Sequence, residues 1–462
     1  MPTPVIAIFD IGKTNKKIIL FDDTYKILQE QTKVFPEIAD ENGDPCEDIQ
    51  SITLWIKDTV AFLQLLEHIE IKAINVSAYG ASFVHLNANF EIATPFYNYL
   101  KFYPRSLQEK FYETYGGQAE LTRETASPAL GSLNSGLQLY RLKYESPNLF
   151  RTIFCSLHLP QYFSYLITSK TYSEITSIGC HTHLWDFKKN RYHDWVIKEG
   201  LDEKLPVLIK SDEVQSFQSI KLNRPMIVGC GLHDSSSALI PYLTSFIEPF
   251  VLISTGTWCI SMNPFNHSPL TDEELKRDCL CYLSYRGKPV KSARLFAGHD
   301  HEIQVERLCL HFNKGKDYYK TVKYDSTLRS TLLEGDKDKN KKTFNTGIEN
   351  STFETRELSS FTDFEKAYHQ LMLDIMDMQF ASTTLVLKNT TVSRIFVDGG
   401  FSKNPVYMSL LATAFPNIEV FGATIAQASS LGAALAIHHQ WNRLPMPENI
   451  IELKHYAGVV TN

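Results

Sequence analysis

Apolar and polar residues form short alternating runs at the start of the chain. Val5 to Phe9, Lys17 to Phe21 and Ile27 to Thr32 are strand-like runs separated by polar turns. Apolar residues then recur every three or four positions from Ile52 to Leu66, which predicts an amphipathic helix, and a short apolar strand is expected at Ile71 to Val76. Three neighbouring strands, a helix and a strand that can pair in parallel make one α/β unit.

A related order returns in the second half of the chain. Strands are expected at Phe250 to Ile253, Trp258 to Met262 and near Cys279 to Tyr285. The C-terminal part is expected to contain, in order, a helix from Phe364 to Leu387, a strand from Ile395 to Asp398, a helix from Pro405 to Ala414, a strand from Ile418 to Phe421 and a helix from Gln427 to His438. The repeat is one of architecture, because no sequence period is visible.

These patterns predict an α/β protein of two actin-like (ribonuclease-H-like) domains with a cleft between them. A chain of 462 residues exceeds the size at which one core keeps growing, and we place the domains at 1–245 and 246–462. Gly116 to Leu166 reads as helical and Ser173 to Trp185 as loop-rich, an insertion that could cap the first domain. Asn313 to Glu357 is polar and is expected to be a solvated surface excursion, with a functional lid as the alternative.

Composition and charge narrow the function classes. Hydrophobic residues make up 43% of the chain and charged residues 21%, and the net charge of -6 comes without a basic block. Neither nucleic acid nor an anionic membrane is therefore indicated as a partner, and a small solute is favoured. The N-terminus is too short and too early charged for a signal peptide, and no run of 18 apolar residues is present, so a cytoplasmic protein is expected. The oligomeric state stays open, with a homodimer as one alternative.

The cysteines lack the paired C-x-x-C spacing of a zinc site. Their apolar or strand-like surroundings predict reduced core residues, with Cys279 and Cys281 on one face of a strand. The eight are Cys46, Cys155, Cys180, Cys230, Cys259, Cys279, Cys281 and Cys309.

Two hairpin turns could bind phosphate. In the first, Asp10-Ile11-Gly12-Lys13-Thr14-Asn15, the glycine lets backbone N–H groups approach a phosphate, and Asp10 could hold magnesium. In the second, Ser254-Thr255-Gly256-Thr257-Trp258, hydroxyls and a glycine offer several donors. Ordinary turn chemistry would explain either motif alone. Together they favour a pair of phosphate-binding hairpins. Actin-like ATPases and kinases bind a triphosphate between two such hairpins.

Two further motifs follow strands. Asp398-Gly399-Gly400 precedes a helix that Pro405 can open, and two glycines would let an adenine ring lie on the backbone. The small-residue helix start Gln427 to Ala434 could flank the same site. His233-Asp234 follows the strand Pro225 to Val228 and places Asp234 at a helix N-terminus, as a cap, a general base or both.

This ordered set of motifs resembles the FGGY family of carbohydrate kinases, and the similarity spans nearly the whole chain. The resemblance implies ATP and Mg²⁺ as cofactors, a small-molecule sugar as substrate, Asp234 as the base that accepts the sugar hydroxyl proton, and Asp10 as the metal-placing residue. The residues implied for nucleotide or metal are Asp10, Gly12, Lys13, Thr14, Asn15, Thr255, Gly256, Thr257, Gly399, Gly400 and Asn404. Those implied for substrate are Ser82, Phe83, His233 and Asp234.

Within the family, Tyr79 to Leu86 looks like the sugar-site strand of rhamnulokinases, which favours a 6-deoxyketohexose such as L-rhamnulose or L-fuculose. Ser82 stands where that pattern carries an acid, and Tyr99-Leu100-Lys101 replaces the Trp-x-Asp of the xylulose and glycerol branches. Arg294 to Asp300 also departs from the family pattern. The alternatives are a pentulose kinase, an actin-like ATP-binding protein such as a chaperone or filament subunit, and a catalytically dead sugar sensor.

Three other groups have plainer interpretations. His181-Thr182-His183 could start a metal site, but no third ligand is placed by spacing. His299-Asp300-His301 is expected to be a polar turn, with a sugar contact as the alternative. The aromatic cluster Tyr97, Tyr99, Phe102 and Tyr103 is expected to pack in the core and on the domain surface, although aromatic faces also bind sugar C–H groups.

Overall fold

A computed structural model describes residues 2–218, 225–335, 346–347, 349–425 and 427–458. The chain forms two compact units, and each contains more than one segment. Unit 1 comprises 1–245, 281–289 and 426–450, and unit 2 comprises 246–280, 290–425 and 451–462. The first segment of unit 1 ends at Ser245, and two short later segments are assigned to unit 1 as well. The domain bounds 1–245 and 246–462 stay a prediction.

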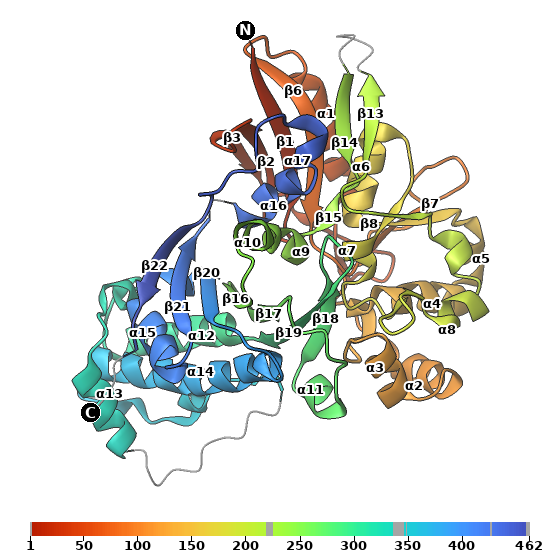
Figure 1. The fold of residues 1–462 in the computed structure, drawn as a ribbon. Coiled ribbons are helices and arrows are strands. Elements are labelled where there is room, and N and C mark those ends of the chain that lie inside the picture. Colours follow the sequence, from red (N-terminus) through yellow and green to blue (C-terminus); the bar gives the residue numbers. More distant parts are fainter. Residues whose placement is uncertain (1, 219–224, 336–345, 348, 426, 459–462) are drawn as a thin grey trace. The chain divides into compact units, whose positions relative to one another are not determined.

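Unit 1 is built on a mixed sheet (Figure 1). Strand β1 pairs antiparallel with β2 and parallel with β6, and β6 pairs parallel with β14. The sheet runs in the order β13-β14-β6-β1-β2-β3, with β15 beside β6. Its strands are β1 (Thr3–Ile11), β2 (Lys16–Asp22), β3 (Ile27–Lys33), β6 (Ile69–Ala78), β13 (Val214–Gln218), β14 (Pro225–Gly229) and β15 (Leu232–His233).

Both faces of this sheet are covered, which explains why β1 is almost continuously apolar. Val5, Ala7 and Phe9 join one core cluster with residues of the helices α1 and α6. The alternate face, on which Asp10 lies, is covered by α16 from the C-terminal part of the chain, drawn in blue beside the red strands in Figure 1. The helices of the sheet's two faces are α1 (Ile49–Leu63), α6 (Leu159–Thr168), α9 (Asp234–Ala238), α10 (Ile240–Ser245), α16 (Ala428–Ala436) and α17 (His438–Trp441).

Between β6 and β13 unit 1 carries an insertion with its own aromatic core around Phe111, Tyr140 and Trp195. Its helices are α2 (Arg105–Thr114), α3 (Gln118–Glu124), α4 (Ser135–Glu145), α5 (Pro147–Thr152), α7 (Ile175–Ile178) and α8 (Asp194–Lys198). Three short strand pairs of the insertion are β7 (Phe83–Leu86) with β8 (Cys155–His158), β9 (Ser173–Glu174) with β12 (Leu208–Ile209), and β10 (Trp185–Asp186) with β11 (Arg191–Tyr192). A further pair, β4 (Glu37–Ala39) with β5 (Pro45–Glu47), precedes α1.

Unit 2 repeats the plan. Strand β16 pairs antiparallel with β17 and parallel with β20, and β20 pairs parallel with β21, matching the pairings around β1 and β6. The strands are β16 (Phe250–Thr255), β17 (Cys259–Asn263), β19 (Pro289–Leu295), β20 (Arg394–Gly399), β21 (Glu419–Thr424) and β22 (Glu452–Tyr456), while β18 (Cys279–Leu283) straddles the boundary of the units. The predicted α/β class with two actin-like domains is confirmed.

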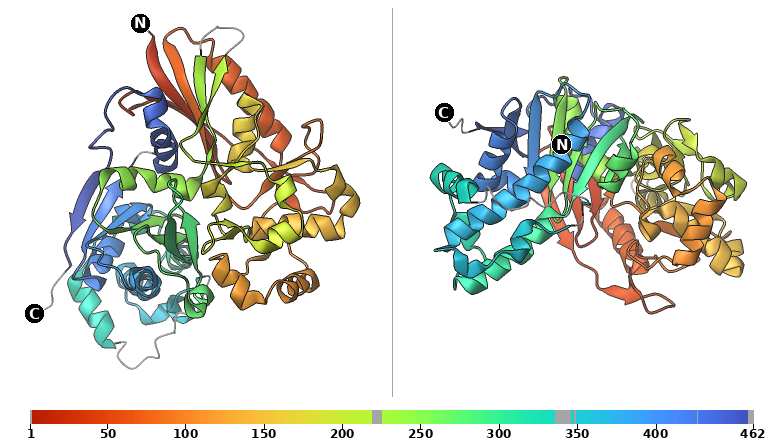
Figure 2. Two further views of the ribbon diagram at one scale, coloured as in Figure 1. Left: turned by 45° about the vertical axis from the view of Figure 1, so that its right-hand side comes forward. Right: turned by 90° about the horizontal axis from the view of Figure 1, so that it is seen from below.

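The helices of unit 2 are α11 (Asp272–Lys276), α12 (Ala297–His311), α13 (Ser326–Gly335), α14 (Phe364–Leu387) and α15 (Pro405–Ala414). Figure 2 shows α14, the long light-blue helix, which packs against α12, α15 and β17. The predicted bounds of α14 and α15 are confirmed. The charged part of the polar excursion, 336–342, lies outside the described residues.

Two local predictions are wrong. His299, Asp300 and His301 lie in α12 and not in a polar turn, because Asp300 and His301 are buried on the inner face of that helix. The predicted continuous strand from Tyr79 to Leu86 is interrupted, since β6 ends at Ala78 and β7 begins at Phe83, with Ala81 at a positive φ between them.

All eight cysteines are buried and lie outside any disulfide bond, as expected. No helix among the described residues is both long enough and apolar enough to cross a membrane.

Candidate active site

The first hairpin joins β1 to β2. Asp10 is paired with Lys17 near the end of the ladder, and the Gly12 N–H donates to the Asn15 carbonyl at 2.9 Å, which closes the turn. Thr14 and Asn15 are exposed. Lys13 is already paired, since its Nζ lies 2.8 Å from Glu37 and 3.5 Å from Glu47.

Asp10 is held by residues from the far end of the sequence. The hydroxyls of Ser429 and Ser430, in the first turn of α16, donate to its Oδ2 at 2.7 and 2.8 Å. Burial raises the pKa of Asp10, while the two hydroxyls lower it and the charge of Asp234 raises it further. Its Oδ1 makes no hydrogen bond or ion pair with any described residue. Within unit 1 the small-residue helix start Gln427 to Ala434 therefore lies beside Asp10, and its place beside the adenine site stays a prediction.

Asp234 opens α9, directly after β15. Its Oδ1 accepts the Ser235 N–H at 2.6 Å and lies 3.2 Å from Nε2 of His233. Its side chain is 34% exposed, and burial raises its pKa to about 6. The carboxylate is thus fixed by its neighbours, partly accessible, and much more basic than an ordinary aspartate.

His233 is enclosed by residues of three segments. Its Nε2 lies 3.1 Å from the Cys180 sulfur, its ring packs 5.5 Å from that of Tyr282, and a Cβ added at Gly80 would lie 3.0 Å from the ring. Burial lowers the pKa of His233 to about 3, so the imidazole is neutral. Gly80 and Tyr282 were not among the predicted site residues, although Gly80 lies within the rhamnulokinase-like segment.

Ser82 and Phe83 are less available than the resemblance implied. The Ser82 hydroxyl is buried and donates to the Tyr97 carbonyl at 3.3 Å. Phe83 is buried in the insertion core and its ring lies 4.0 Å from that of His158. Their roles in substrate binding stay predictions, and neither side chain offers a free polar group.

Lys101 occupies the position of the missing acid in a Trp-x-Asp motif. Its Nζ forms a short ion pair with the buried Asp40 and lies 2.9 Å from Asp44. Tyr99, two residues earlier, packs edge-on against Tyr79 at 5.9 Å. Burial raises the pKa of Tyr99. The charge of Lys13 lowers this pKa and that of Asp234 raises it, so the Tyr99 hydroxyl interacts electrostatically with both residues.

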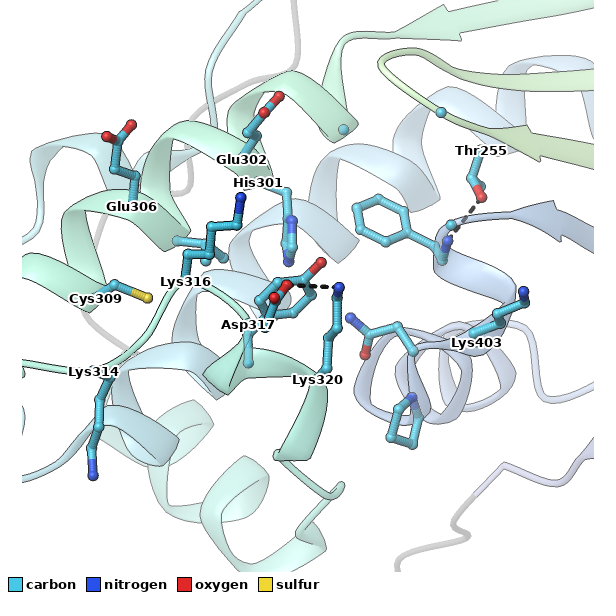
Figure 3. A pocket seen from close by; sticks show the side chains of 18 of the residues that line it. Thr255, His301, Glu302, Glu306, Cys309, Lys314, Lys316, Asp317, Lys320 and Lys403 are labelled. Atoms are coloured by element: carbon cyan, nitrogen blue, oxygen red, sulfur yellow. Dashed lines mark hydrogen bonds and ion pairs between the residues drawn. The ribbon is translucent and has the colours of Figure 1, made fainter. Parts of the chain in front are cut away.

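Unit 2 contains a cavity of about 1170 Å³ along α12. Figure 3 shows lysine and acidic side chains around it, with His301 pointing inward from α12. Four of the predicted nucleotide residues line it, namely Thr255, Gly256, Gly400 and Asn404. Thr257 is exposed in the hairpin, and its carbonyl accepts the His299 N–H at 3.1 Å.

Two glycines are required by the backbone around this cavity. Gly399 has φ +80°, and a Cβ there would lie 1.8 Å from the Thr255 carbonyl oxygen. A Cβ at Gly298 would lie 1.8 Å from the Gly256 carbonyl oxygen. Thr255 fastens the two turns together, because its hydroxyl donates to the Asp398 carbonyl and accepts the Phe401 N–H. The hairpin, the Gly399 turn and the start of α12 are therefore in backbone contact.

Asn404 lines the cavity but its side chain is engaged elsewhere. Its Oδ1 accepts the N–H groups of Val406 and Tyr407 and so caps α15, and its Nδ2 donates to the Tyr368 hydroxyl at 2.7 Å. The amide is thus a structural cap, and its predicted contact with nucleotide would need a third hydrogen bond.

His183, in the motif for which a metal site was the less favoured interpretation, has no ring nitrogen left for a metal ion. Both ring nitrogens of His183 are hydrogen-bonded, to Tyr112 and Thr125. Among the described residues, Glu124, Asp186 and His193 alone bring three ligand atoms within 4.8 Å. Nδ1 of His193 accepts the Trp195 N–H, so its proton is on Nε2, which donates to Glu124 at 2.8 Å. Those internal bonds account for this cluster.

Comparison with known proteins shows which family this chain belongs to. Residues 5–241 match the N-terminal domain of the FGGY family of carbohydrate kinases, and residues 247–331 match an FGGY C-terminal domain. A curated rhamnulokinase from Halalkalibacterium halodurans is 24% identical over 259 residues, which is 54% of this chain and 54% of that protein. The chain thus matches about half the length of this relative.

Solved structures share the fold over the whole chain. A carbohydrate kinase from Novosphingobium aromaticivorans superposes with a TM-score of 0.79 at 22% identity, covering 99% of this chain and 95% of that one. A ligand-bound xylulose kinase from Lactobacillus acidophilus has the same TM-score at 17% identity, with 99% and 94% covered. The chain belongs to the FGGY family of carbohydrate kinases.

Proposed function

We propose that this protein transfers the terminal phosphoryl group of ATP to a hydroxyl of a small ketose, with Asp234 as the general base. The observation that carries the proposal is the state of Asp234, which is fixed at the start of α9, one-third exposed, and shifted by burial to a pKa of about 6. A carboxylate with that pKa is ionised at neutral pH and basic enough to accept a hydroxyl proton.

Two contacts support this role. The Ser235 N–H and the neutral His233 ring hold one carboxylate oxygen, Oδ1, which leaves Oδ2 for the substrate. In the reaction the sugar hydroxyl gives its proton to Asp234, its oxygen bonds to the terminal phosphorus, and the bond to ADP breaks. Positioning and charge neutralisation dominate such a transfer, so the base supplies only part of the rate.

Asp10 is the residue that fits a magnesium ion. Its Oδ2 is occupied by two serine hydroxyls, while its Oδ1 has no partner among the described residues. The charge of Asp234 raises the pKa of Asp10, and a nearby cation would offset that repulsion. When bound, magnesium would neutralise phosphate charge and orient the phosphates.

The cavity in unit 2 is the proposed nucleotide site. Gly400 has open space where its Cβ would be, so a flat ring could lie against this backbone. Lys316 and Lys403 line the cavity and form no ion pair with described residues, and both could neutralise phosphate. The close backbone approaches at Gly298 and Gly399 bring the hairpin, the Gly399 turn and the start of α12 together in this wall.

For the sugar, we propose a 6-deoxyketohexose such as L-rhamnulose or L-fuculose. The rhamnulokinase match and the packing of Tyr79 with Tyr99 support it. Lys101 also supports it, because it stands where the xylulose and glycerol branches have the acid of Trp-x-Asp and is paired with Asp40. A pentulose is the second candidate, favoured by the fold shared with a xylulose kinase.

The test is ADP release with magnesium and ATP across a panel of ketoses, aldoses and polyols. Asp234→Asn should lower turnover by roughly 10²–10⁴ with nucleotide affinity unchanged. Asp58→Asn, on the exposed side of α1, is the matched control and should retain wild-type turnover. ADP release that no sugar stimulates would favour an actin-like ATPase, and a variant that keeps a tenth of the turnover would reduce Asp234 to a helix-starting residue.

The fold of the variant can be checked independently. Burial raises the pKa of Asp234 above its unfolded value, so the folded state loses stability as pH rises through about 6. Asparagine carries no charge to desolvate. At pH 7.5, the unfolding midpoint of Asp234→Asn should therefore equal or exceed that of the wild type.

A further inference from the structure

His301 is a buried, neutral side chain at the wall of the nucleotide cavity, and none of the motifs accounts for it. It lies in the second turn of α12, is 7% exposed, and points into the cavity (Figure 3). Its ring meets those of Phe401 and Tyr319 edge-on, each at 5.1 Å. Gly400, with open space in place of a Cβ, lines the same cavity.

A chain of three side chains fixes which nitrogen of His301 carries the proton. Asn404 Oδ1 accepts the Val406 and Tyr407 N–H groups at 3.0 and 3.1 Å, which sets the orientation of the amide. Its Nδ2 must then donate to the Tyr368 hydroxyl, at 2.7 Å. Because the Tyr368 oxygen already accepts this bond and the phenol has one proton to give, we assign that proton to the bond with Nε2 of His301, 3.0 Å away. Since Nε2 accepts, the imidazole proton lies on Nδ1.

The Nδ1–H is available to a ligand. Burial lowers the pKa of His301 to about 4, so the ring stays neutral through the physiological range. Nδ1 makes no hydrogen bond to any described residue. The cavity wall thus presents one neutral donor of fixed direction, between two aromatic rings and a flat glycine backbone.

We propose that His301 reads the purine base of the nucleotide by donating its Nδ1–H to a ring nitrogen of adenine. Ring nitrogens of adenine are neutral acceptors in the plane of a flat ring, which matches a neutral donor framed by aromatic side chains. Phosphate oxygens are better matched by the charged Lys316 and Lys403 of the same cavity. The inference rests on the proposed nucleotide-binding function and names the residue that would recognise the base.

Calorimetric binding of ADP and of its 1-deaza, 3-deaza and 7-deaza analogues to the wild-type protein, with magnesium, tests the proposal. One analogue, in which C–H replaces the nitrogen that His301 contacts, should bind roughly 5- to 30-fold more weakly than ADP, because the buried donor loses its acceptor. In His301→Leu, ADP and that analogue should bind equally. His311→Leu, at the exposed end of α12, is the control and should keep the wild-type ratio.

A second measurement needs no nucleotide. The ¹⁵N spectrum of labelled histidine, assigned through His301→Leu, should show His301 protonated on Nδ1, and Tyr368→Phe should release this preference. The inference would be overturned if the wild type bound all three analogues as tightly as ADP, or if the proton of His301 lay on Nε2. In either case, binding of ADP itself would still support the proposed kinase function. Failure of the wild type to bind ADP would instead overturn the proposed function.

Discussion

At the scale of single residues, the proposed chemistry depends on two aspartates whose pKa values are raised in the folded protein. Asp10 and Asp234 both have a raised pKa in unit 1, and each lacks a cationic partner at hydrogen-bond distance. A purely structural aspartate is usually paired or capped, with its pKa lowered, as Asp40 and Asp48 are here. The contrast separates the two candidate aspartates from the rest.

The raised pKa of Asp234 predicts a pH dependence. The base must be ionised to accept a proton, so below a pH of about 6 kcat/KM for the sugar should fall roughly tenfold per pH unit. Steady-state rates from pH 5 to 8 at saturating magnesium and ATP would measure this limb. Asp234→Glu should move the midpoint while retaining some activity. A flat profile down to pH 5 would show that no group of this pKa takes the proton.

At the scale of elements, the nucleotide cavity is shaped by two adjacent glycines with different constraints. Gly399 has a positive φ and touches the Thr255 carbonyl, so any side chain there would disturb the fold. Gly400 has φ -63° and open space at its Cβ position. A side chain at Gly400 should therefore leave the fold intact and occupy only the cavity.

Gly400→Leu should consequently raise KM for ATP by about tenfold or more and leave KM for the sugar nearly unchanged, because leucine would fill space proposed for adenine. Both constants come from one set of initial rates. Gly335→Leu, at the exposed end of α13, is the control for adding a leucine in unit 2. Equal changes in both constants, with an unchanged unfolding midpoint, would place this turn away from the nucleotide.

The same elements show what the sequence could predict. Strong periodicity located β1, α14 and α15 to within two residues. The contact of Ser429 with Asp10 joins positions 419 residues apart, and no local pattern carries such information. His299-Asp300-His301 resembled a turn because all three residues are polar. In the structure, hydrogen bonds of His301 with Tyr368 and of Asp300 with the Ser351 N–H satisfy these side chains, so they can be buried on the inner face of a helix.

At the scale of the whole molecule, the two sheets share one plan but the insertion of unit 1 does not repeat. The insertion reaches Asp234 through Cys180, which lies against His233. Motifs in the two repeated sheet domains therefore identified the family. We expect the identity of the sugar to depend on loops and aromatic packing in the insertion, for which the chain offers no repeated pattern. This is why the reaction class follows from sequence more readily than the substrate.

We expect 6-deoxyketohexoses to be better substrates than pentuloses, by several-fold. The partly buried ring of Tyr99 packs 5.9 Å from the buried ring of Tyr79, which lies 6.4 Å from that of Phe96. Tyr99 is therefore the ring of this group against which a substrate methyl group could pack, and burying one methyl is worth about 1 kcal/mol. Values of kcat/KM for L-rhamnulose, L-fuculose, D-xylulose and D-ribulose would measure the preference. Tyr99→Ala should reduce it toward unity, because that ring would contact the methyl group. A pentulose value more than roughly tenfold above both deoxyketoses would refute the preference and leave the kinase assignment intact.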